Sequence, residues 1–231
     1  MDNDKKIFMS FVIAIIALFL GFASVAFASD NYSRTALLVI DVGNDMMHEK
    51  GVFGSFGTAA YAKKYGIAAN IAKAIEIAEK KNMPVIRVWI EYETGMPEVY
   101  CSETGQFRKI ADKMGKFFVK GTWGAKPFAG LEPKEGQLQV FKKRMNAFYG
   151  TNLESILRGW GVNTLLIAGV TAEGCVASTL VGAADRDYNI VALRDCIAGG
   201  SEEVCNFMFD KVFPFWKVRV IKLREYFDNE L

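Results

Sequence analysis

Short apolar runs alternate with longer segments of helical periodicity along the chain. The runs are rich in Val, Ile and Leu and are too short for buried helices, which is typical of strands covered on both faces. The six predicted strands are residues 36–41, 85–90, 138–142, 164–169, 190–195 and 218–223. Apolar residues recur three or four positions apart in the predicted helices, which are residues 60–81, 153–160, 175–187 and 202–212.

The alternation of strand and helix predicts a parallel sheet with helices packed on both faces. The expected fold class is therefore α/β, a three-layer α/β/α sandwich around a mostly parallel, Rossmann-like six-stranded sheet. Residues 91–133 lack a clear period, and we expect them to form loops or a short excursion over the site. In such sheets, ligands bind beyond the carboxyl ends of the strands.

The first 28 residues are expected to form an export signal. Lys5-Lys6 precedes an uncharged stretch that ends in Ala26-Phe27-Ala28, a pattern that signal peptidase accepts. The stretch is also long enough to span a bilayer, so an uncleaved membrane anchor is the alternative. We expect residues 29–231 to form one domain of an exported protein, periplasmic or secreted, that meets the membrane only if the segment is not cleaved.

Composition narrows the classes of partner and cofactor. The formal net charge is +2 and acidic residues are interspersed with basic ones, so we expect no nucleic-acid partner. Four cysteines are too few for a disulfide scaffold; Cys196 and Cys205 could pair after export or stay free and buried. The single histidine, His48, cannot assemble a histidine-rich ligand set, and we expect no metal and no cofactor.

Four residues with acyl-transfer chemistry lie at or just beyond predicted strand ends: Asp41, Lys142, Cys175 and Asp195. Cys175 opens a predicted helix, where free N–H groups and a partial positive charge lower a thiol pKa and stabilise an oxyanion. Asp41 could serve as the base and Lys142 as the cation beside the thiolate if the fold brings the strand ends together. The leading interpretation is a cysteine hydrolase.

Three segments resemble motifs of the isochorismatase-like cysteine hydrolase family. Leu37-Leu-Val-Ile-Asp-Val-Gly-Asn-Asp resembles its LLVIDxQND opening. Lys142-Lys-Arg-Met-Asn-Ala-Phe-Tyr-Gly-Thr-Asn-Leu resembles its KxRxSAFxGTxL segment, and Gly169-Val-Thr-Ala-Glu-Gly-Cys-Val-Ala-Ser-Thr is similar to its GVxTxxCVxxT turn. One such motif is weak evidence, but three in order are strong.

The resemblance implies a catalytic triad of Asp41, Lys142 and Cys175. Asp41 would take the thiol proton and later activate water, while Lys142 would hold the thiolate and the carboxylate. The motif spacing selects Lys142 over its neighbour Lys143, and alternation along a strand directs these two side chains to opposite faces.

The resemblance also implies an oxyanion hole made by backbone N–H groups near the nucleophile, those of Thr171, Ala172 and Cys175. The family's non-proline cis peptide would join Val170 to Thr171.

Substrate contacts are expected from four residues: Gly43, Asn44, Trp123 and Phe148. Gly121-Thr-Trp-Gly-Ala resembles a stretch of the ureide- and carbamoyl-cleaving branch, although simple packing explains Trp123 equally well. The usual family residues are replaced at several positions, and we expect a pocket with smaller side chains and lower polarity than usual. The replacements are Gly43, Met46, Ala172 and Gly174.

We therefore expect a cysteine-dependent hydrolase that cleaves a C–N bond of a small amide, ureide or N-carbamoyl substrate through a thioester. The resemblance implies a homo-dimer or homo-tetramer, whose buried face could include Phe213, Phe215 and Trp216 unless these pack in the core. Two alternatives stay open: an isochorismatase-type vinyl-ether hydrolase, and a membrane-tethered small-molecule-binding pseudoenzyme. Cys175 counts against the first and the intact triad against the second.

Overall fold

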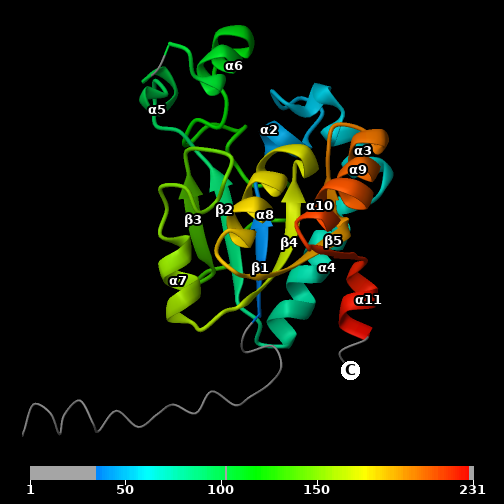
Figure 1. Cartoon of the computed structure of the whole chain (residues 1–231). Coiled ribbons are helices and arrows are strands. Elements are labelled where there is room, and N and C mark those ends of the chain that lie inside the picture. Colours follow the sequence, from blue (N-terminus) through cyan, green and yellow to red (C-terminus); the bar gives the residue numbers. More distant parts are fainter. Residues whose placement is uncertain (1–34, 102, 229–231) are drawn as a thin grey trace, which may run out of the picture. The chain divides into compact units, whose positions relative to one another are not determined.

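A six-stranded parallel sheet forms the centre of the molecule in the computed structural model, which describes residues 35–101 and 103–228 (Figure 1). The strands lie in the order β3-β2-β1-β4-β5-β6, and all neighbouring pairs are parallel. Their bounds are β1 Thr35–Ile40, β2 Val85–Ile90, β3 Leu138–Lys142, β4 Thr164–Val170, β5 Asn189–Ala198 and β6 Arg219–Ile221. The predicted α/β sandwich and the six predicted strands are confirmed.

The central strands are covered on both faces, which explains their unbroken apolar sequences. Every residue of β1 and β2 is buried. Alternate residues of β1 enter different core clusters: Leu37 and Val39 pack on one face, Leu38 and Ile40 on the other. The sheet therefore separates two hydrophobic cores.

Helices cover each face. The core on one face receives α3 Thr58–Lys64, α4 Ile67–Lys80 and α11 Leu223–Asp228. The other receives α7 Leu153–Gly159, α8 Ala177–Ala184 and α9 Glu202–Phe207. The short elements are α2 Asn44–Met47, η1 Gly54–Phe56, α5 Pro97–Tyr100, α6 Gln106–Met114, η2 Ala172–Val176, η3 Met208–Val212 and α10 Phe213–Phe215.

Several boundaries differ from the prediction. The expected helix 60–81 is divided at Gly66, whose positive φ of 64° ends α3 and begins α4. The expected strand 218–223 is shorter, because Leu223 already belongs to α11. In the irregular segment after β2, α5 and α6 form beyond the carboxyl ends of the strands, as the expected excursion over the site (Figure 1).

The structure also bears on the N-terminal segment, on the two cysteines that could pair and on the aromatic residues near Pro214. Residues 1–28, the expected export signal, lie outside the described residues, among which no helix is long and apolar enough to span a bilayer. Cys196 and Cys205 are free buried thiols in the cores on opposite faces of the sheet, which keeps them apart. Phe213 packs in the core, whereas Phe215 is exposed.

The strands β1 and β4 are in tight contact at Gly169, which pairs with Ile40. Gly169 has a φ of +124°, and a Cβ there would lie 2.1 Å from the Ile40 carbonyl oxygen. Only glycine fits this backbone and this approach. Asp41 follows Ile40, and the turn that carries Cys175 follows Gly169. The pairing of Ile40 with Gly169 therefore brings Asp41 near this turn.

Replacing Gly169→Ala is expected to lower the free energy of unfolding by about 3 kcal/mol, because both the positive φ and the backbone collision add strain. The matched control is Gly159→Ala in α7, where a Cβ meets nothing within 4 Å. Alanine there should be neutral or stabilising by up to about 1 kcal/mol. Urea denaturation measures both variants, and equal stabilities would contradict the assigned role of Gly169.

Candidate active site

Three of the four predicted residues meet at the carboxyl edge of the sheet. Lys142 ends β3 and reaches across the end of β2, so that its Nζ lies 2.7 Å from Asp41 Oδ2. The same Nζ donates to Cys175 Sγ at 3.3 Å and to the Arg144 carbonyl oxygen at 3.1 Å. Two hydrogen bonds and one ion pair therefore compensate the charge of this fully buried lysine.

Asp41 is held by backbone contacts on the neighbouring strand. Its N–H donates to the Val88 carbonyl at 2.8 Å, and its Oδ1 accepts from the Ile90 N–H at 2.7 Å. Oδ2 is close to Lys142 as an ion pair but accepts no well-aligned hydrogen bond from the described residues. The carboxylate also interacts with the Cys175 thiol, and Oδ2 retains the capacity to accept a proton from it.

The electrostatics of Cys175 differ from the expectation of a lowered thiol pKa. The pKa of Cys175 is raised to about 12, chiefly because burial disfavours the thiolate and also because Asp41 lies beside it. Lys142 opposes the rise without cancelling it, since its charge is shared with Asp41. The shift is therefore opposite in direction to the expected lowering of the thiol pKa.

Lys142 is a cation at rest. Burial alone lowers its pKa, but Asp41 and Cys175 outweigh burial, and the net pKa is raised above the ordinary lysine value. The neighbouring Lys143 points elsewhere, as alternation predicted: its Nζ lies 3.0 Å from Glu98 of α5 and donates to the Glu91 carbonyl. Arg144 also donates to the Glu98 carbonyl, so the residues after Lys142 contact α5.

Cys175 lies in the π-helical turn η2, which joins β4 to α8. The Thr171 carbonyl accepts hydrogen bonds from Gly174 and Val176 N–H, both at 3.1 Å. The expected cis peptide between Val170 and Thr171 is present. Thr171 and Cys175 line the cavity of the site, whereas Ala172 is buried behind it. The oxyanion role of these amides stays a prediction.

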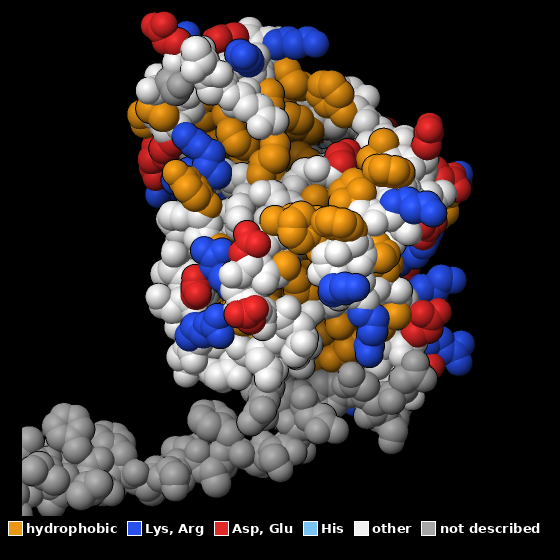
Figure 2. Space-filling view, viewed as in Figure 1, with side chains coloured by type: hydrophobic (Ala, Val, Ile, Leu, Met, Phe, Trp, Pro, Cys, Tyr) orange, Lys and Arg blue, Asp and Glu red, His pale blue; other side chains and the backbone are white. Residues whose placement is uncertain are grey.

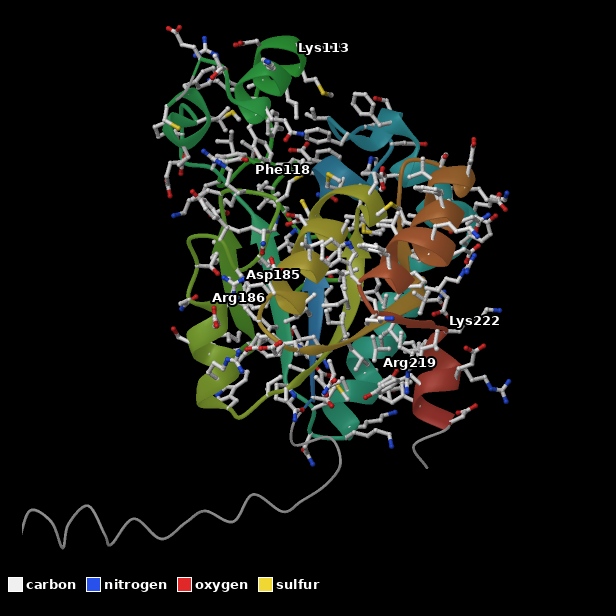
Figure 3. The ribbon with its side chains drawn as sticks, in the orientation of Figure 1. Lys113, Phe118, Asp185, Arg186, Arg219 and Lys222 are labelled. Atoms are coloured by element: carbon white, nitrogen blue, oxygen red, sulfur yellow. The ribbon has the colours of Figure 1, made fainter. Side chains whose placement is uncertain are left out.

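A cavity of about 280 Å³ opens directly on Asp41 and Cys175. Its walls come from elements far apart in sequence, and they are mainly apolar: Met46, Phe53, Phe56, Ile90, Phe107, Ile110, Phe118 and Met145. Apolar side chains gather below α6 in Figure 2. In Figure 3, Phe118 lies between α6 and the sheet. The sequence analysis had connected Met46 with the pocket but not the other wall residues, because most of these lie outside the motifs.

The four residues expected to contact the substrate do not line this cavity. Gly43 forms an isolated bridge with Pro127, and Asn44 Nδ2 donates to the Trp123 carbonyl at 2.9 Å. The Trp123 ring packs edge-on against His48. In the structure, the motif residues Gly43 and Asn44 hold neighbouring loops in place, and the expected substrate contacts stay a prediction.

Phe148 also lies outside the cavity and stacks on Tyr188 in the core. Asp195 has a structural role as well, because β5 continues to Ala198 instead of ending at this residue. The Asp195 Oδ1 accepts from the Leu223 N–H at 2.8 Å and so holds the start of α11. Asp195 therefore does not join the triad.

A motif residue that was not singled out supports the cavity wall. The Asp45 carboxylate accepts from the Phe118 N–H at 2.8 Å and from the Val52 N–H at 3.3 Å. A Cβ at Gly124 would lie 2.2 Å from this carboxylate, so only glycine leaves room for it. Asp45 therefore fixes two loops that carry aromatic wall residues.

The single histidine lies away from the triad. His48 ends α2, and its Nδ1 accepts from the Lys50 N–H at 3.1 Å. Within the described part of the chain, no three His, Cys, Asp or Glu side chains come together in a group that could hold a metal ion.

Comparisons of the sequence and of the fold with known proteins point to one family. Residues 35–219 match the isochorismatase domain. The chain is 32% identical over 178 residues to a probable inactive nicotinamidase of Arabidopsis thaliana, covering 76% of this chain and 86% of that protein. It is 30% identical over 176 residues to the ureidoacrylate amidohydrolase RutB of Agrobacterium fabrum, covering 71% and 75%.

Solved structures agree. An isochorismatase family protein from Desulfovibrio vulgaris is similar with a TM-score of 0.73 and 25% identity, covering 85% of this chain and 97% of that one. N-carbamoylsarcosine amidase from Thermoplasma acidophilum is similar with a TM-score of 0.66 and 25% identity, covering 82% and 96%.

Removing the buried ammonium group by Lys142→Met is expected to cost about 3–5 kcal/mol of unfolding free energy, because Asp41 then lacks its counter-ion. Lys143→Met is the matched control, since that lysine belongs to a partly exposed pair and should cost under about 1 kcal/mol. Chemical denaturation at neutral pH measures both, and similar losses would contradict the assignment of the buried contact.

The raised thiol pKa predicts a particular pH dependence of alkylation. Because the thiolate fraction rises tenfold per pH unit below the pKa, the iodoacetamide rate at Cys175 should still be rising steeply at pH 9. Exposed Cys101, followed by mass spectrometry in the same sample, should be labelled faster. A rate at Cys175 that is already constant near pH 7 would show that the thiolate is the resting form.

Proposed function

The chain belongs to the isochorismatase domain family, and we propose that it is a cysteine-dependent hydrolase of a C–N bond in a small amide, ureide or N-carbamoyl compound. Two relatives carry names that support this class of reaction, the ureidoacrylate amidohydrolase and the N-carbamoylsarcosine amidase. The proposed nucleophile is Cys175, the proposed base is Asp41, and Lys142 is the proposed cation.

The observation that carries the proposal is the buried contact of Lys142 with both Asp41 and Cys175 at the base of a cavity. Base, cation and thiol must lie within reach of one another for a covalent mechanism. An ammonium group that is paired with Asp41 and donates two further hydrogen bonds does not release a proton easily, so Lys142 acts as a fixed charge. The proton transfers fall to Asp41, whose Oδ2 can accept one.

The first half of the reaction forms a thioester. As Cys175 Sγ attacks the carbonyl carbon, its proton passes to Asp41, and the developing oxyanion is stabilised by backbone N–H groups of the η2 turn. The C–N bond then breaks, and Asp41 returns the proton to the departing nitrogen. Ammonia or an amine leaves, and Lys142 stabilises the negative charge on sulfur or carboxylate throughout.

The second half releases the acid. Asp41 takes a proton from a water molecule, and the resulting hydroxide attacks the thioester carbonyl. The C–S bond breaks, and the sulfur recovers the proton from Asp41, which restores the resting thiol. No proton needs to leave the site at any step, and a raised thiol pKa is compatible with this internal transfer.

The alternatives differ in their need for sulfur. A vinyl-ether hydrolase of isochorismate type needs the acid but no thiol, and a binding protein needs no proton acceptor near Cys175. One relative is named as probably inactive in nicotinamide hydrolysis, but the complete set of contacts around Lys142 supports an active site in this chain.

The test is ammonia release from a panel of amides, ureides and carbamoyl compounds. Cys175→Ala and Asp41→Asn should each lower turnover at least ~10³-fold, because residues that act as one unit are each indispensable. Cys101→Ala is the control and should leave turnover unchanged, since this exposed thiol lies outside the cavity. Acid quenching should trap an acyl group on Cys175, detected by mass spectrometry.

Full activity in Cys175→Ala would exclude the proposed mechanism. Rapid release of pyruvate from isochorismate by the same variant would support the vinyl-ether alternative.

A further inference from the structure

The charge of the cavity limits the substrates that it can hold. Among the described residues that line it, none is Lys, Arg or His, while two are the carboxylates Asp41 and Glu173. Lys142 has no exposed surface, and its charge is already paired with Asp41. A carboxylate on a substrate would lose its hydration there without gaining a cation, which is strongly unfavourable.

The walls favour an uncharged, apolar group instead. Four phenylalanines surround the space, and the rings of Phe53 and Phe118 lie parallel at 5.2 Å. Ile110, Met46 and Met145 complete the apolar lining, and methionine side chains adapt to the shape of a ligand. Burial of apolar surface is therefore the main attraction that this cavity offers.

The volume gives the size of the occupant. A cavity of about 280 Å³ equals the volume of roughly nine liquid water molecules, so it accommodates a molecule with a single ring. The end of the cavity at Cys175 must hold the carbonyl carbon, which leaves the aromatic walls for the acyl group.

We propose that, given the proposed function, the substrate is an uncharged carboxamide whose acyl group is a single aromatic ring or a branched apolar chain. An anionic ureido or carbamoyl acid is disfavoured, because none of the described lining residues offers a cation to its carboxylate. The amide and one water molecule give ammonia and a carboxylic acid: the C–N bond breaks on forming the thioester, and water then breaks the C–S bond. The acid ionises to an anion for which the apolar lining has no partner, which favours its departure.

Glu173 is the specificity residue in this proposal. Its Oε1 accepts from the Gly200 N–H at 2.9 Å, which holds the carboxylate at the cavity wall. Replacing Glu173→Gln keeps an oxygen that can accept this hydrogen bond but removes the charge. The variant therefore tests the effect of the negative charge while the contact with Gly200 is kept.

The experiment compares benzamide with 4-carbamoylbenzoate, which carries the same ring and amide plus one carboxylate. The wild-type protein should prefer benzamide at least about 100-fold in kcat/KM, because the extra charge has no partner in the cavity. Glu173→Gln should narrow the preference by up to about fivefold, because this exposed charge is partly screened by water. Ile110→Lys, which adds a cation to the wall, should narrow it further.

Gln106→Lys is the matched control: it adds the same charge to α6 but at an exposed position outside the cavity, and the preference should stay unchanged. Binding of both compounds to Cys175→Ala is measured by calorimetry, so that selectivity is read apart from turnover. Tighter binding of benzamide there, with no hydrolysis by the wild type, would contradict the proposed function alone. Equal or tighter binding of 4-carbamoylbenzoate, or no binding of either compound, would overturn the substrate proposal.

Discussion

The buried ammonium group of Lys142 is the interaction on which the arrangement of the site depends. A lysine without solvent contact is tolerated only when acceptors surround it, and here the acceptors come from three different parts of the chain. Asp41 follows β1, Cys175 lies beyond β4, and the Arg144 carbonyl follows β3. One side chain thus fixes the relative positions of Asp41 and Cys175.

The parallel sheet makes this convergence possible. Carboxyl ends of neighbouring strands meet at one edge, and the pairing of Ile40 with Gly169 and of Ile90 with Lys142 brings the relevant ends level. The close approach at Gly169 narrows the gap between β1 and β4 further. Catalytic geometry here is therefore a property of strand register, and the side chains add the chemistry.

The sequence predicted the strands, the layers and the meeting of Asp41, Lys142 and Cys175, because each depends on local pattern and on motifs. It also predicted a cavity of low polarity. It did not identify the walls, since Phe107 and Phe118 lie in a segment without periodicity. The direction of the thiol pKa shift was wrong, because it depends on burial and on how Lys142 divides its charge, which only the three-dimensional arrangement determines.

The excursion between β2 and β3 has a consequence for how such enzymes diversify. It supplies α6 and Phe118 as one continuous insertion, while the strand ends that carry the triad lie on either side of it. A change of sequence at Phe107, Ile110 or Phe118 therefore alters the shape of the cavity without replacing a residue of any strand. The fold thus places this wall of the cavity and the contacts among Asp41, Lys142 and Cys175 on separate segments of the chain, so that the first can vary in sequence while the second are kept.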